Sequence, residues 1–284
     1  MVQACVFCGD DVDSQGEHVH PQWLLGLWDG TGPFTAKIDG KQRLNKTGDL
    51  VHSAKMWRVM LPCCKNCNGD LNRLFEQPAT NPMRRLIRDM QPLEDQVTIS
   101  NVARWAIKTL ALMAHPDANH NALPSGPEGG PHGPWKPYPR GVLDSIKVGG
   151  VPTDTSLWFA VTDSDMPGLP DPAFDEVLLR HTSRSDGLGG RGGARTTGFR
   201  LADGRMAVFQ LAYHPFHDFE HRFERDGLVT RLWPDPPSRL DVRNHPVLDH
   251  GTRLAQYFIE DGFSHELTWE ERSHGSGPPW NQWC

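Results

Sequence analysis

The sequence predicts an α+β protein in three parts: a small zinc-stapled unit at the N-terminus, a helical segment, and a C-terminal β-rich region. Three observations predict it. Two C-x-x-C pairs stand near the N-terminus, apolar residues recur at helical spacing from Leu71 to Met113, and β-branched and aromatic residues dominate several segments after Gly141. We expect the zinc unit and its helices in residues 1–115, a linker in 116–141 and the β-rich region in 142–284.

Length and net charge limit the number of domains and the kinds of partner that the sequence predicts. A chain of 284 residues can bury a substantial core in one large or two modest domains. Its formal charge is −6, with the acidic excess in the second half, so composition shows none of the strongly basic footprint that indicates nucleic-acid binding. A local basic patch can still bind nucleic acid.

The sequence predicts a cytoplasmic protein that does not cross a membrane. The start, "MVQACVFCGDD", lacks the basic and apolar regions of a signal peptide. The most apolar stretch, "ARWAIKTLALMA", is short and carries Arg104 and Lys108. In such a chain, six cysteines favour metal ligation over disulfides.

Three segments have the periodicity of helices packed on a core. "NGDLNRLFEQ" places Leu71, Leu74 and Phe75 on one face. "NPMRRLIRDM" has Pro82 at a plausible first helical position. "SNVARWAIKTLALMAHP" is expected to begin at a cap on Ser100 or Asn101 and to end before the proline; its apolar stripe is Val102, Trp105, Ala106, Leu110 and Met113.

The second half has the patterns of strands. "SLWFAVT", "EVLLRHT" and "TGFRLADGRMAVFQLA" are strand-like, and Asp203-Gly204 is a hairpin turn signal. The Gly-rich stretch from Ser183 to Thr196 is expected to be a mobile insertion between two strands. We expect this region to bind a protein partner, form a homo-oligomer contact or cover the site described next.

The cysteine spacing predicts one structural zinc. Cys5 and Cys8 form one C-x-x-C pair, and Cys64 and Cys67 form a second. Four thiolates in two such pairs suit the tetrahedral geometry of structural zinc. Cys63 is left spare by this pairing, and Cys284 lies far away at the C-terminus.

A histidine-rich stretch, "GEHVHPQWLL", lies between the two pairs and resembles part of a known motif. The zinc-containing HNH endonucleases have a C-x-x-C, then Glu/Asp-His followed by Pro, then a C-x-x-C that opens a helix. The matching residues here are Cys5, Cys8, Glu17, His18, Pro21, Cys64, Cys67 and Asn68. The later "ARWAIKT" also resembles a helix in uncharacterised actinobacterial members of that family.

The resemblance implies a ββα-metal fold and metal-dependent hydrolysis of phosphodiester bonds in DNA or RNA. His18 would be the general base, and Glu17 and Asn68 would hold a second divalent ion, Mg²⁺ or Mn²⁺. Possible supporting residues are His20, His52 and Asn72. Neighbours on a regular strand point to opposite sides, so Glu17 and His18 share one site only where the strand ends or bulges.

Three alternatives stay open at this stage. The "EHVHP" histidines can instead cap the zinc unit through hydrogen bonds. The whole unit can be an HNH-derived scaffold that is not a nuclease, either a metalloenzyme acting on a small molecule or a zinc-stabilised binding protein. In "YHPFHDFEH", the residues His214, His217 and His221 would align on one helical face and could bind a metal, or could simply lie in a loop.

Overall fold

The computed structural model describes the chain in several ranges. The described residues are 3–12, 16–28, 34–35, 37–38, 41–42, 45, 47–49, 52–53, 60–113, 115, 140–152, 154–163, 177–182, 193–213 and 221–248. Within them the fold is mixed helix and sheet, with the large sheet in the C-terminal half, as the sequence predicts.

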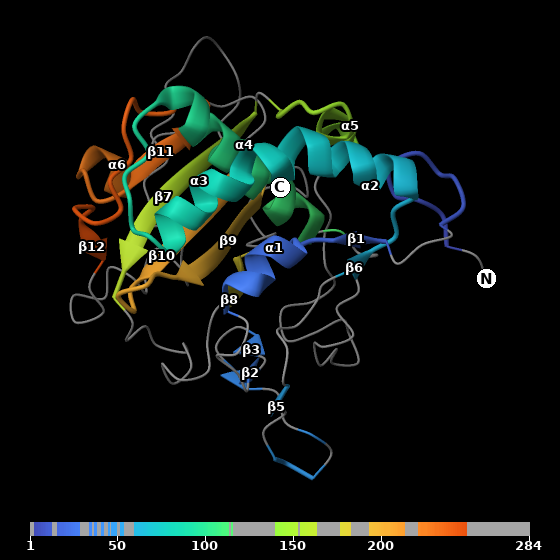
Figure 1. Cartoon of the computed structure of the whole chain (residues 1–284), viewed down its shortest axis with the longest axis horizontal. Helices are drawn as coiled ribbons and strands as arrows, with labels where there is room; N and C mark the ends of the chain where they lie inside the picture. Colours follow the sequence, from blue (N-terminus) through green and yellow to red (C-terminus); the bar gives the residue numbers. More distant parts are fainter. Residues whose placement is uncertain are drawn as a thin grey trace, which may run out of the picture.

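The C-terminal half forms one six-stranded sheet (Figure 1). Its strands are β7 (Thr155–Thr162), β8 (Val177–Thr182), β9 (Gly193–Arg200), β10 (Met206–Tyr213), β11 (Thr230–Trp233) and β12 (Val247–Leu248). The order is β11-β7-β10-β9-β8, with every pair antiparallel, and β12 adds to β7 in parallel.

The expected hairpin turn lies between β9 and β10. Gly204 has φ of 91°, a left-handed conformation that glycine adopts without a Cβ clash. The Leu201 N–H donates to the Arg205 carbonyl across this turn at 2.7 Å. The mobile insertion was expected to reach Thr196, but β9 already begins at Gly193, because its residues pair with the full length of β10.

The two faces of the sheet meet different partners because side chains alternate along each strand. Phe159 and Phe209 are register partners on the face that packs against the helices. Trp158 and Gln210 are register partners on the opposite face, where the segment around His221 covers them.

Helices α2 (Lys65–Leu71) and α3 (Gln77–Ile87) are joined end to end by a π-helical turn, η2 (Asn72–Glu76). The expected helix start at Pro82 is therefore wrong, because that proline lies inside α3. A proline ring clashes with the carbonyl four residues earlier. Pro78 is the second residue of α3, and the carbonyl four residues before it, that of Leu74, lies in the π turn η2.

Helix α4 (Gln96–Met113) lies across the sheet beside α3 (Figure 1). It begins four residues before the expected cap at Ser100, because Asp95 accepts the Thr98 N–H at 2.7 Å and so caps an earlier turn. Its end before Pro116 and its apolar stripe are confirmed, since every stripe residue is buried.

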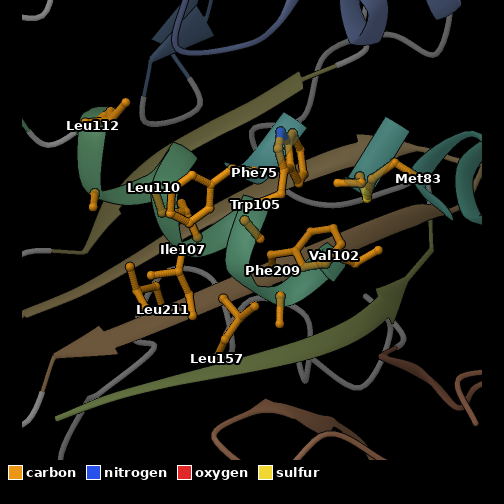
Figure 2. Close-up of a cluster of buried hydrophobic side chains, with 14 of the residues drawn as sticks. Phe75, Met83, Val102, Trp105, Ile107, Leu110, Leu112, Leu157, Phe209 and Leu211 are labelled. Atoms are coloured by element: carbon orange, nitrogen blue, oxygen red, sulfur yellow. The ribbon is translucent and has the colours of Figure 1, made fainter. Parts of the chain in front are cut away.

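A single hydrophobic cluster runs from Cys5 through the helices and the sheet to Val242. Figure 2 shows Phe75, Trp105 and Ile107 in the same cluster as the sheet residues Phe209 and Leu211. The described residues of the N-terminal unit, the helices and the sheet therefore share one core. Most of the expected linker lies outside the described residues, and α5 (Arg140–Lys147) begins at its C-terminal end.

The shorter elements lie in the N-terminal unit and near β7. They are β1 (Glu17–His18), α1 (Gln22–Leu25), η1 (Gly26–Trp28), β2 (Phe34–Thr35), β3 (Lys37–Ile38), β4 (Lys41–Gln42), β5 (His52–Ser53), β6 (Met60–Leu61) and α6 (Arg222–Arg225). None of the helices in the described ranges has the length and apolar character needed to cross a bilayer.

Candidate functional site

The four predicted cysteines converge on one point. The sulfur atoms of Cys5, Cys8, Cys64 and Cys67 all lie within 4.8 Å of one another. The Cys8 and Cys64 sulfurs are 3.6 Å apart, too far for a disulfide bond. Sulfurs about 2.3 Å from one tetrahedral zinc lie about 3.8 Å apart, so this spacing fits a zinc site.

Backbone hydrogen bonds bring the two pairs together. The Cys5 N–H donates to the Asp10 carbonyl at 2.7 Å, and Gly9 donates back to the Cys5 carbonyl at 2.9 Å, closing a tight knuckle. Gly9 has φ of 82°, which suits glycine. The Val6 N–H donates to the Pro62 carbonyl at 3.1 Å, which ties this knuckle to the second pair.

The protonation of the thiols also favours a bound cation. Burial raises the pKa of Cys5, but backbone N–H groups of Cys64, Cys8 and Phe7 outweigh it and lower that pKa to about 6. Burial, then hydrogen bonds with Cys64 and Cys8, raise the pKa of Cys67. One thiolate therefore forms readily and the next is opposed, and a bound metal ion such as zinc would offset the cost of forming the others.

Cys63 is not part of this set. It is fully buried, and its thiol donates weakly to the Cys64 carbonyl at 3.6 Å. Burial, with the charges of Cys5 and Glu17, raises its pKa, which keeps the sulfur a neutral thiol. Within the described chain it belongs to the core, as the spacing of the pairs predicts.

The "EHVHP" stretch enters a short antiparallel ladder next to the cysteines. Glu17 pairs with Leu61, and His18 pairs with Met60. Leu61 is three residues before Cys64 in the chain. Gly16 must be glycine, because it has φ of 81° and an added Cβ would lie 2.5 Å from the Leu61 carbonyl oxygen. This close approach fixes where β1 starts.

Asn68 ties helix α2 to the same ladder. Its Nδ2 donates to the Gly16 carbonyl at 3.2 Å. Asn68 thus lies beside the start of β1, and its amide nitrogen is used in a structural contact. The side chain is half-buried, so the amide group stands at the edge of the metal unit.

Glu17 turns into the core and not toward solvent. Its side chain is 4 % exposed, and its Oε1 accepts a hydrogen bond from Lys108 Nζ at 2.8 Å. The same Nζ donates to Glu76 Oε1 at 2.7 Å. These three side chains, from β1, α4 and η2, form a buried charge triad, a term used below for Glu17, Lys108 and Glu76.

The two glutamates hold Lys108 in its charged form. Burial lowers the pKa of Lys108, but attraction to Glu17 and Glu76 outweighs it and raises that pKa to about 12. Burial raises the pKa of Glu17, opposed by Lys108 and reinforced by the charge of Glu76.

Neither partner of Glu17 was predicted from the sequence. Lys108 interrupts the apolar run "AIKTLALM", which is the signal that could have found it, because a lysine in a buried helix needs an anionic partner. Glu76 carried no comparable signal. Glu76 is the last residue of the π turn η2, and the sequence pattern did not indicate that turn.

His18 and His20 lie in different environments. His18, on β1, is half-buried. His20 is 3 % exposed and packs edge-on against Phe199 of β9, with ring centroids 6.2 Å apart. Burial, with Lys108 nearby, lowers the pKa of His20 to about 4, and its Nε2 has no hydrogen-bond partner within the described residues.

The aromatic packing around Trp105 fixes this part of the chain to the sheet. Its ring centroid lies 5.9 Å from that of Trp23 of α1 and 5.8 Å from that of Phe199 of β9. Pro21 is buried directly before α1. The segment after His20 is thus held against α4 and the sheet.

The remaining candidates do not enter this site in the described residues. Asn72 is exposed at the first position of η2. His52 lies in β5, and its side chain is outside the described residues.

His221 is a structural histidine. Its Nδ1 accepts the Phe223 N–H at 3.1 Å, and its Nε2 lies 2.9 Å from Gln210 Oε1, so the proton is on Nε2. With both nitrogens hydrogen-bonded, His221 offers no lone pair to a metal. His214 and His217 lie outside the described residues, so the expected alignment of the three imidazoles stays untested.

In comparisons with known proteins, no family model matches the chain, and no curated protein or solved structure matches it either. The resemblance to HNH endonucleases therefore rests on the quoted motif residues alone.

Proposed function

We propose that the chain is an HNH-like hydrolase of nucleic-acid phosphodiester bonds, with a zinc-stapled N-terminal unit and His18 as general base. One observation carries the proposal. A half-buried His18 lies on a two-residue strand, paired with the strand that leads into Cys64 and the helix beyond it. A strand pair followed by a helix at a metal centre is the order that the resemblance implies.

The chemistry assigned to His18 is deprotonation of water. Imidazole suits this role because its ordinary pKa lies near neutrality. The water oxygen forms a bond to phosphorus, the bond from phosphorus to the leaving sugar oxygen breaks, and that oxygen takes a proton from solvent. The zinc on the four cysteines would hold the strand pair and α2 together and takes no part in this step.

A second divalent ion, Mg²⁺ or Mn²⁺, is the cofactor that the resemblance implies at Glu17 and Asn68. The residues do not fit it in this conformation. The Glu17 carboxylate is buried against Lys108, and Asn68 binds the Gly16 carbonyl through its amide nitrogen. Glu17 as a ligand stays a prediction that would require its ion pair to open.

A cleavage assay with matched histidine variants tests the proposal. Purified full-length chain is incubated with DNA and RNA, with Mg²⁺, Mn²⁺ or chelator. We expect His18→Ala to lose cleavage by about 100-fold or more while keeping its zinc. His115→Ala, at a histidine just after α4, should cleave like wild type. Equal cleavage by wild type and His18→Ala would point to a contaminating nuclease.

The buried ion pair of Glu17 favours a second candidate: an HNH-derived scaffold that does not cleave nucleic acid. A metal-dependent nuclease needs an acidic ligand that faces its ion, and Lys108 already neutralises this one. Such a scaffold would be a zinc-stabilised binding protein or a metalloenzyme acting on a small molecule. The absence of cleavage on every nucleic acid, with zinc and folding intact, would select this candidate.

The partners follow from the candidate chosen. DNA or RNA is the partner of the hydrolase, and the C-terminal sheet is the proposed contact for a protein partner or a second copy of the chain. A centre built from four free thiolates suits a reducing compartment, so we place the protein in the cytoplasm.

A further inference from the structure

Lys108 occupies the place between Glu17 and Glu76 that a cation would take. Its Nζ lies 2.8 Å from Oε1 of Glu17 and 2.7 Å from Oε1 of Glu76. The two glutamates are far apart in sequence and come from β1 and η2. Their oxygens nevertheless converge on one atom, and that atom belongs to a third element, helix α4.

The site is closed to solvent. Lys108 is 0 % exposed, Glu17 is 4 % and Glu76 is 10 %. Bringing an ion to this position would first require the ammonium to leave, because two cations cannot share one pair of carboxylates at hydrogen-bond distance. Removing the lysine is strongly unfavourable, because it leaves the charge of the buried glutamates uncompensated.

Two contacts fix the backbone at the glutamates that bind the Lys108 ammonium. The π turn η2 ends at Glu76, and Thr80 donates to the Glu76 carbonyl at 2.8 Å, which fixes the backbone there. Glu17 is held by the close approach of Gly16 to Leu61. The backbone at Glu76 and beside Glu17 is thus fixed by contacts that do not involve Lys108.

Within the described residues, only the four cysteines lie close enough together to hold a metal with three or more side chains. The triad and His20 do not add a second group of that kind. The positive charge at Glu17 therefore comes from the chain itself.

We infer that Lys108 is a built-in replacement for a divalent cation: it fills the cation position between Glu17 and Glu76, so the protein binds no Mg²⁺ or Mn²⁺ through Glu17. The inference concerns the cofactor of the proposed hydrolase. It is tested by metal binding and not by cleavage, so either can fail without the other.

The experiment compares metal binding by the full-length chain and its variants. Zinc is counted by elemental analysis, and Mn²⁺ binding is followed by electron paramagnetic resonance and by its effect on melting temperature. For wild type we expect one zinc and no Mn²⁺ site that depends on Glu17. Lys108→Ala should gain one Mn²⁺ site at least about tenfold tighter than any in wild type, with a higher melting temperature when Mn²⁺ is present.

A matched double variant locates the new site. Lys108→Ala combined with Glu17→Gln should lose the Mn²⁺ site, because the amide removes one of the two anionic ligands. If Lys108→Ala folds only with Mn²⁺ present, the inference is also supported, since the ion then replaces the missing ammonium.

Two results would overturn the inference. One is a wild-type Mn²⁺ site that disappears in Glu17→Gln, which would mean that the carboxylate is open to an ion despite Lys108. This comparison of wild type with Glu17→Gln does not depend on whether Lys108→Ala folds. The other is a Lys108→Ala variant, folded or not, that neither binds Mn²⁺ nor is stabilised by it.

Discussion

Acid should destabilise this protein through His221, and the size of the effect follows from the surroundings of that side chain. His221 is fully buried under Trp158, and both ring nitrogens are hydrogen-bonded in the neutral state. A second proton would go on Nδ1, where it would displace the Phe223 N–H and bury a positive charge. Burial, and secondarily Arg231, lower the pKa of His221 to about 3.

The lowered pKa of His221 determines in which direction the unfolding free energy changes with pH, and over which pH range. An unfolded chain binds the proton with a pKa of about 6.5, so between about pH 6.5 and 3 the unfolded state holds more protons. The stabilising contribution of neutral His221 is complete above about pH 6.5 and is lost progressively as the pH falls. At pH 5 the loss amounts to about 2 kcal/mol of unfolding free energy.

Urea unfolding of zinc-loaded protein at several pH values measures this contribution. His20 is also buried, with its pKa lowered to about 4, and acts in the same direction. The comparison is therefore the difference in slope between wild type and His221→Gln, which cannot take up the proton. His115→Gln, at a half-buried histidine, serves as the control for replacing an imidazole by an amide. Identical pH slopes for wild type and His221→Gln would refute the reasoning.

Three further changes test the metal unit and its core. Cys67→Ser should lose the bound zinc by elemental analysis, whereas Cys63→Ser, one residue before the second pair, should keep it; equal zinc in both would contradict the four-cysteine site. Lys108→Met should lower the unfolding free energy in urea by about 3–5 kcal/mol, because it leaves two buried carboxylates unpaired; a loss under about 1 kcal/mol would mean that the triad is not buried in solution. Gly16→Ala should cost more than about 2 kcal/mol in the same assay, because the new Cβ would clash with the Leu61 carbonyl, and an unchanged stability would show that β1 is not held there.

The sequence determined the parts of the fold that depend on local patterns. Enrichment in β-branched and aromatic residues along "SLWFAVT" and "AVFQLA" is enough to identify β7 and β10, because such residues favour strands and a strand buried on both faces reads as a nearly continuous apolar run. Two C-x-x-C pairs are enough to predict that their sulfurs meet, since two such pairs together supply the four thiolates of a tetrahedral zinc site. The start of α4 was predicted at the wrong residue because the sequence offers two residues that can cap it, Asp95 and Ser100. In the structure the Asp95 side chain accepts hydrogen bonds from Thr98 and caps the helix.

Only the tertiary structure decided what Glu17 and His20 do. From sequence, both stand beside His18 and suit a shared site. In the fold, strand alternation turns Glu17 toward helix α4, and Lys108 and Glu76 meet it there from positions 91 and 59 residues further along the chain (108 − 17 and 76 − 17). His20 packs on Phe199 of the distant sheet. Such pairings join segments that no local period connects, because the cost of burying a charge is met by whichever opposite charge the complete fold brings within reach.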